Sequence, residues 1–257
     1  MKSFLILFFF LFHSHYVLAN ITGNTCENIT QHLNKKDKIK ITYIVGYKDA
    51  RPARFVGDRY EKNVIVHKIT EACQEDEFLC EFERSEKDAF LFKKSWKGKR
   101  IYFRLMSSSV TENDDENLTH PFQQWLSGRV KKEFLLSLWQ SDILFYNGHS
   151  RSGGGPDFYP PLLKKDKQID FKKYKNGHGS FKQILNYFKK VNQPLSVLGL
   201  FSCKATQHFE RDLNKQKKNV LLLTAPNLIY FKEAMDKSLY SLEYLMKSDC
   251  KKLNSLL

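Results

Sequence analysis

The sequence predicts an α/β fold in which a mostly parallel, doubly wound sheet is covered by helices on both faces, as in a three-layer sandwich. Strand-length apolar runs alternate with helical patterns through the second half of the chain. These runs are continuously apolar, which is typical of parallel strands buried on both faces. With 257 residues, 42% of them hydrophobic, the chain can form a sizeable core, and no repeat or linker divides it. We therefore expect one domain.

Apolar and β-branched runs predict the strands. The core strands are expected at residues 40–46, 142–146, 196–201 and 219–224. A short strand is expected at 78–82. Two aromatic-rich runs, 89–94 and 100–106, are separated by SWKGK and predict a small hairpin or strand pair.

Apolar residues at helical spacing predict the helices. They are expected at residues 60–73, 122–140, 181–191 and 231–246, with a further helix-like stretch beginning near Ala205. The acidic segment 111–119 is expected to be a surface loop. The segment 147–179, rich in Gly, Pro and Lys, predicts a long loop of the kind that is often functional.

The amino terminus has the pattern of a signal peptide. Lys2 precedes an apolar run over 4–12, and the small-residue end Val17-Leu18-Ala19 predicts cleavage after Ala19. The run is shorter than the roughly 20 residues that span a bilayer, so an uncleaved anchor is the less favoured alternative. We expect a secreted or periplasmic protein without an integral membrane segment. Its polar lead-in, 20–38, would precede a single domain at 39–257.

The five cysteines predict two disulfides and one free thiol in an oxidising compartment. Cys73 and Cys80 are close in sequence and can join a helix end to the next strand. Cys26 and Cys250 lie near the two ends of the mature chain and can tie them together. Cys203 is then the unpaired cysteine.

The net charge of +14 does not by itself predict a nucleic-acid partner. Only nine of the 42 basic residues are arginine, the residue that favours bidentate phosphate contacts, and the lysines are scattered along the chain. We expect a solvated basic surface, suited to acidic substrates or an anionic envelope, and no binding of nucleic acid.

Two reactive side chains follow consecutive predicted strands. His149 follows the strand at 142–146, and Cys203 follows the strand at 196–201. Ligands of doubly wound sheets bind at the carboxyl ends of the strands, so both residues are expected at one rim. A thiol and an imidazole placed together can form a dyad in which the thiolate attacks a carbonyl and the imidazole carries the proton, without a cofactor or metal.

Two further features of these segments fit a peptide site. The glycines of the loop are expected to let the backbone approach a bound peptide; they are Gly148, Gly153, Gly154 and Gly155. The backbone N–H of Cys203 is expected to help stabilise an oxyanion.

The blocks ILFYNGHS and LGLFSC resemble the clan of cysteine peptidases that contains caspases, legumain, clostripain and gingipains. In that clan one hydrophobic strand ends in His-Gly and a later one in Ala-Cys or Ser-Cys. The resemblance covers these two blocks and the order of strands and helices from 39 to 246. It implies a caspase-like fold and cleavage of a peptide or protein substrate through a thioester.

The resemblance also assigns roles to individual residues. His149 matches the catalytic histidine, Cys203 the nucleophile and Ser202 the small residue before it. Ser150 stands where the clan has a glycine whose backbone N–H joins that of the nucleophile in the oxyanion hole. A serine at this position must reach the same backbone geometry without the freedom of glycine.

Two properties of the clan carry over only as candidates. Its substrate preference is set by one charged pocket residue, for which Asp157 and Arg151 are candidates. The lysine-rich segment 164–175 resembles an exposed processing segment of a zymogen.

Two other functions compete with a peptidase. A zinc hydrolase would need ligands such as His149, His178, Cys203 and His208, but compact spacings such as HExxH are absent from the sequence. A catalytically inactive caspase-like scaffold that binds peptides or envelope partners is the main alternative, and Ser150 keeps it open. A serine hydrolase and a nucleotide-binding protein are disfavoured, since neither G-x-S-x-G nor a Walker motif occurs.

Overall fold

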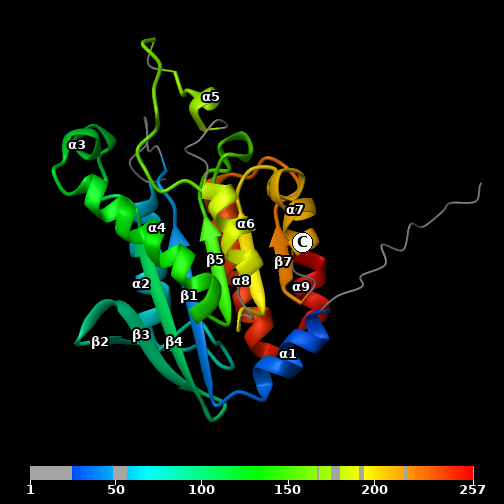
Figure 1. Ribbon diagram of the computed structural model, residues 1–257. Coiled ribbons are helices and arrows are strands. Elements are labelled where there is room, and N and C mark those ends of the chain that lie inside the picture. The colour runs from blue at the N-terminus through cyan, green and yellow to red at the C-terminus, as the bar shows by residue number, and fades with distance from the viewer. Residues whose placement is uncertain are drawn as a thin grey trace, which may run out of the picture.

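A computed structural model describes residues 25–48, 57–166, 168–174, 180–190, 194–216 and 219–256 (Figure 1). Over these residues the strands form one seven-stranded sheet in the order β2-β3-β4-β1-β5-β6-β7. The expected signal segment, 1–19, lies outside the described residues.

A run of parallel strands forms the centre of the sheet and confirms the predicted fold class. Adjacent members all pair in parallel; they are β4 (Lys99–Ser107), β1 (Lys38–Val45), β5 (Ile143–Asn147), β6 (Val197–Phe201) and β7 (Leu221–Thr224). Each lies close to a run that the sequence predicted. Every residue of β5 and β6 is buried, which explains why these segments are apolar without alternation.

The predicted hairpin is confirmed and extends one edge of the sheet. β3 (Asp88–Trp96) is antiparallel to β4, and β2 (Glu83–Ser85) is antiparallel to β3. The turn between β3 and β4 places Lys97 at φ 47° and Gly98 at φ 76°. Two successive left-handed residues match the twist of antiparallel strands, which is why a Lys-Gly pair serves this turn.

Helices cover both faces of the sheet. One face carries α1 (Cys26–Asn34), α2 (Asp58–Thr70), α8 (Phe231–Lys247) and α9 (Cys250–Leu256). The other carries α4 (Gln123–Gln140), α6 (Ser180–Lys190) and α7 (Arg211–Gln216). In β5, Phe145 belongs to the first core, and Leu144 and Tyr146 belong to the second. The central strands therefore contribute to two apolar cores at once.

Three segments differ from the expectation. The lead-in 20–38 contains α1, which buries Cys26, Ile29 and Leu33 and is therefore part of the domain core. The prediction of a strand at 78–82 is wrong, because this segment is a loop whose Phe78 and Leu79 amides donate to the Glu243 carboxylate at 2.9 and 3.0 Å.

The prediction of a surface loop at 111–119 is also wrong. This segment contains α3 (Asp114–Thr119), whose amino-terminal amides donate to the Asn113 side chain. Asn117 is buried, and its side-chain amide exchanges hydrogen bonds with the Thr111 backbone at 2.9 and 3.0 Å, so its polar groups are satisfied. A polar composition thus concealed a helix whose buried asparagine is hydrogen-bonded to the segment just before it.

Both predicted disulfides are confirmed. Cys26–Cys250 joins α1 to α9 and closes a loop with a sequence separation of 224, and Cys73–Cys80 closes one with a separation of 7. Cys203 is the free cysteine. None of the helices in the described ranges combines the length and apolar composition that crossing a bilayer requires.

The two disulfides should differ in their effect on stability. Cross-linking reduces the entropy of the unfolded chain more for a longer loop, by about 5 kcal/mol for the larger loop and about 2.5 kcal/mol for the smaller one. We expect Cys26→Ala/Cys250→Ala to lower the free energy of unfolding more than Cys73→Ala/Cys80→Ala, as measured by denaturant titration. A larger loss for the second pair would contradict this ranking.

Candidate active site

The carboxyl ends of β5 and β6 bring the two predicted site residues to one edge of the sheet. Asn147, the last residue of β5, is the parallel partner of Phe201, the last residue of β6. His149 and Cys203 each follow their strand by two residues, so they leave the sheet at equivalent positions. The loops at this end carry α3 and the short helix α5 (Phe171–Lys173), at the top of Figure 1.

His149 is half-buried and lies against the first residue of α8. Its imidazole and the Phe231 ring are 5.2 Å apart between centroids, with an interplanar angle of 70°. Burial lowers the pKa of His149 well below its usual value, and the positive charges of Arg151 and Lys48 lower it further. The neutral imidazole, which can accept a proton, is therefore the favoured form at neutral pH.

Cys203 is half-buried and contacts the same segment of chain as His149. Its Sγ lies 3.5 Å from the backbone oxygen of Ile229, to which the thiol donates. The Cys203 side chain packs against the core on the α8 side of the sheet. Ile229 contacts the thiol and Phe231, two residues later, contacts the imidazole. Residues 229–231 thus adjoin both candidate catalytic groups on one side of the sheet.

The turns after both residues contain strained backbone. Arg151 and Ser152 have φ values of 44° and 52°, and Lys204, directly after Cys203, has φ 54°. Such left-handed conformations of non-glycine residues cost of order 1–3 kcal/mol each and cluster at functional sites. Ser150 has φ −80° and ψ −17°, which any residue adopts. The conformation at this position therefore does not require the glycine of the resembled clan.

Two glycines of the His149 loop are required by internal packing, whereas the approach of a peptide to this backbone stays a prediction. A Cβ atom at Gly148 would lie 2.4 Å from the Tyr146 hydroxyl, and one at Gly155 would lie 2.6 Å from the His149 oxygen. The Tyr146 hydroxyl occupies this space because it accepts a hydrogen bond from the Asp157 amide at 2.8 Å. The loop that carries His149 is thereby held against the end of β5.

Arg151 and Asp157, the two candidate pocket residues, are buried and paired with each other. The Arg151 Nε donates to Asp157 Oδ2 at 2.7 Å, and the guanidinium lies 5.3 Å from the centroid of the Tyr174 ring. Burial raises the pKa of Asp157, and the charge of Arg151 opposes this effect. Because each charge offsets the other, this pair fits a structural role better than the selection of a charged substrate.

A second buried charge pair lies beneath the rim and was not predicted from the sequence. Lys48 is fully buried three residues after β1, and its ammonium group pairs with Glu61. Glu61 Oε1 also accepts from the Asn147 side chain at 2.7 Å and from the Tyr43 hydroxyl at 3.4 Å. The Lys48 ammonium lies 4.5 Å from the centroid of the Phe231 ring. In the sequence Lys48 belongs to a turn-like, polar segment, which gives no sign of burial.

Phe231 also lines an apolar groove between α2 and α8. The groove has a volume of about 300 Å³ and is bordered by Tyr60, Val64 and Met235. The same phenylalanine ring therefore contacts the candidate base and forms part of a surface that can accept an apolar side chain.

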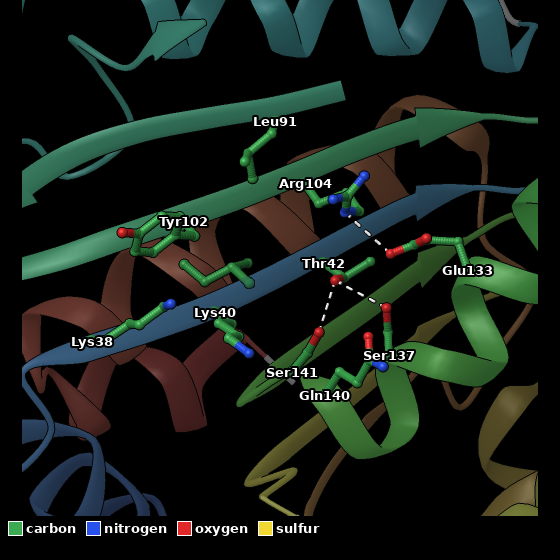
Figure 2. A pocket seen from close by; sticks show the side chains of 11 residues that line it. Lys38, Lys40, Thr42, Leu91, Tyr102, Arg104, Glu133, Ser137, Gln140 and Ser141 are labelled. Atoms are coloured by element: carbon green, nitrogen blue, oxygen red, sulfur yellow. Dashed lines mark hydrogen bonds and ion pairs between the residues drawn. The ribbon is translucent and has the colours of Figure 1, made fainter. Parts of the chain in front are cut away.

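A separate pocket of about 220 Å³ lies at the opposite end of β1, between β4 and the end of α4 (Figure 2). The hydroxyl of Thr42 contacts those of Ser137 and Ser141 at 3.1 and 2.8 Å, and Arg104 pairs with Glu133 at 3.1 Å. None of the predicted site residues lines this pocket, so we do not assign the chemistry to it.

Two other expectations involve residues that are only partly described. Within the described ranges, His, Cys, Asp and Glu form no group of three or more that could hold a metal; His178, one proposed zinc ligand, lies outside them. In the proposed processing segment, Lys164, Lys165 and Asp166 are exposed, whereas Lys167 and Lys175 lie outside the description. Processing at this segment stays a prediction.

Comparison of the sequence with protein-family models and with curated proteins finds no match.

The lowered pKa of His149 predicts a specific dependence of stability on pH. The unfolded chain binds a proton at its ordinary imidazole pKa, about 6.5, whereas the folded protein binds it only at lower pH. Above the unfolded-state pKa of about 6.5, His149 is neutral in both states and does not reduce the free energy of unfolding. Below that pH the unfolded chain takes up a proton that the folded protein does not, so the free energy of unfolding falls. We expect the free energy of unfolding of wild type to fall relative to that of His149→Gln on acidification from pH 7 to 5, as measured by denaturant titration. An equal fall in the two proteins would contradict the lowered pKa of His149.

The Arg151–Asp157 pair predicts strong coupling between two substitutions. Removal of one partner leaves a buried charge unpaired, which costs about 3–5 kcal/mol of stability. We expect Arg151→Met and Asp157→Asn each to be strongly destabilising, and the double variant to lose clearly less than their sum. Additive losses in a double-mutant cycle would show that the two groups do not stabilise each other.

Proposed function

We propose that this protein is a cysteine endopeptidase of caspase-like architecture in which His149 and Cys203 form the catalytic dyad. The observation that carries the proposal is the equivalent position of the two residues beyond paired strand ends, with residues 229–231 adjoining both. The parallel sheet with helices on both faces and the strained turns after each residue support it.

The proposed reaction uses only groups of this chain and water. His149 accepts the proton of the Cys203 thiol, and the thiolate attacks the carbonyl carbon of the scissile bond. The backbone N–H groups of Ser150 and Cys203 donate to the oxyanion. The C–N bond then breaks as His149 donates its proton to the leaving amine, leaving a thioester. Water, deprotonated by His149, then attacks the thioester carbonyl, and the C–S bond breaks. His149 returns the proton to the departing thiolate, which releases the acid product and restores the free thiol.

The thiol has to move before this reaction begins. In the structure Cys203 donates to the Ile229 oxygen, so its side chain has to turn away from that carbonyl to give its proton to His149. Catalytic hydrogen bonds are often loose before substrate binds. The same contact favours the second candidate, an inactive caspase-like scaffold that binds peptides or envelope partners, since a thiol held by a backbone carbonyl can be purely structural.

We also propose that the protein acts outside the cytoplasm, in a secreted or periplasmic form. Two disulfides are compatible with an oxidising compartment, and the amino-terminal pattern predicts export.

Replacing either member of the dyad should abolish peptide hydrolysis without unfolding the protein. We expect Cys203→Ala and His149→Ala to lower kcat/KM by about a thousandfold or more, because each removes a group that acts in the transition state. Turnover would be measured on a proteome-derived peptide library by mass spectrometry. His67→Ala, at an exposed histidine on α2, is the matched control and should retain activity. Retained turnover in the Cys203 or His149 variant would refute the dyad.

Chemical labelling separates the peptidase from the scaffold. A peptidyl chloromethyl ketone should alkylate Cys203 in the folded protein faster than in the denatured chain and much faster than in folded His149→Ala. Equal rates in all three samples would instead support the inactive scaffold.

A further inference from the structure

We propose that Phe231 is a positioning residue for His149, with its ring held in place by the buried Lys48 ammonium group. This inference rests on the proposed dyad, in which the orientation of the imidazole toward Cys203 determines whether the proton can be transferred. It adds to that dyad three groups that the sequence did not single out: Phe231, Lys48 and Glu61.

The anchor of this arrangement is fixed by the core of the protein. Lys48 is fully buried, and its ammonium pairs with Glu61, which is itself buried. The second oxygen of Glu61 accepts from Asn147, the last residue of the strand that carries His149. The cation is therefore held relative to β5 by groups with little freedom to move.

The ring of Phe231 links this anchor to the imidazole. The Lys48 ammonium lies 4.5 Å from the ring centroid, within the range of a cation–π interaction. The His149 imidazole meets the ring at an interplanar angle of 70°, which is an edge-to-face contact. Two directional contacts on one ring restrict both its orientation and that of the imidazole. An aliphatic side chain of similar size can fill the space but cannot form the cation–π contact or the edge-to-face contact.

The position of Phe231 in the chain ties the ring to the nucleophile as well. It is the first residue of α8 and lies two residues after Ile229, whose oxygen accepts from the Cys203 thiol. The charged groups named around His149 are Lys48, paired with Glu61, and Arg151, paired with Asp157. Phe231 contacts the imidazole directly and carries no proton itself, so its contribution is one of geometry.

The test is Phe231→Leu, which keeps an apolar side chain and removes the aromatic ring. We expect kcat to fall about tenfold with KM within about twofold of wild type, since misplacing a catalytic group slows the chemical step. Phe231→Tyr, which keeps an aromatic ring, should retain most of the wild-type activity. Phe122→Leu, at a phenylalanine that is 64% exposed at the start of α4, makes the same change away from the site; it is the matched control and should behave like wild type. A rise in KM with unchanged kcat would overturn the proposal and assign Phe231 to the apolar groove.

A spectroscopic readout keeps the test independent of activity. The imidazole resonances of His149, assigned by their loss in His149→Ala, should show a ring-current shift and cross-peaks to the Cys203 Hβ protons. Both should be lost in Phe231→Leu, and unchanged spectra would overturn the proposal.

If the variants of Cys203 and His149 retain turnover, the dyad fails, but these spectra still decide whether Phe231 orients the imidazole. Should Phe231→Leu not fold, Lys48→Met/Glu61→Gln removes the cation without leaving an unpaired buried charge and should weaken the same cross-peaks.

Discussion

The candidate active site depends on the parallel pairing of β5 with β6, in which Asn147 is opposite Phe201. A parallel register aligns the carboxyl ends of both strands, so the side chains that follow them emerge at one edge. A shift of one residue in the register would move each side chain of the strand from one core to the other. Phe145 and Leu144 occupy different cores, and the burial of both fixes the register. The placement of His149 and Cys203 therefore follows from the packing of the sheet.

Buried charges shape the rim that this pairing creates. Lys48 and Arg151 both lower the pKa of His149, and each is neutralised by its own carboxylate, Glu61 or Asp157. Buried ion pairs contribute little net stability, but they fix geometry because breaking them is costly. Here one pair anchors the Phe231 ring beside the imidazole and the other lies in the turn that follows it. The neutral state and the orientation of His149 thus arise from the same set of groups.

The sequence was most informative where burial imposes a pattern. The bounds of β5, β6, α4 and α8 were predicted to within a few residues. A continuous apolar run predicts a buried strand, and apolar residues at helical spacing predict a helix with one buried face. Both disulfides were also predicted from their positions in the chain. Polar segments were harder: α3 was missed because its buried polar residues, Asp114 and Asn117, are hydrogen-bonded to Tyr47 and to Thr111. The pairing of Lys48 with Glu61, and of Glu61 with Asn147 86 residues later, depends on contacts that no local pattern encodes.

The most direct test of the central claim is chemical cross-linking of the two rim residues. Dibromoacetone carries two electrophilic carbons separated by one carbonyl, so it can bridge a thiol and an imidazole only where the two groups lie side by side. If the register delivers both groups to one site, the native protein should yield a bridge between Cys203 and His149, identified by peptide mapping, and the denatured protein should not. A native adduct on Cys203 that bridges to another residue, or to none, would contradict the account.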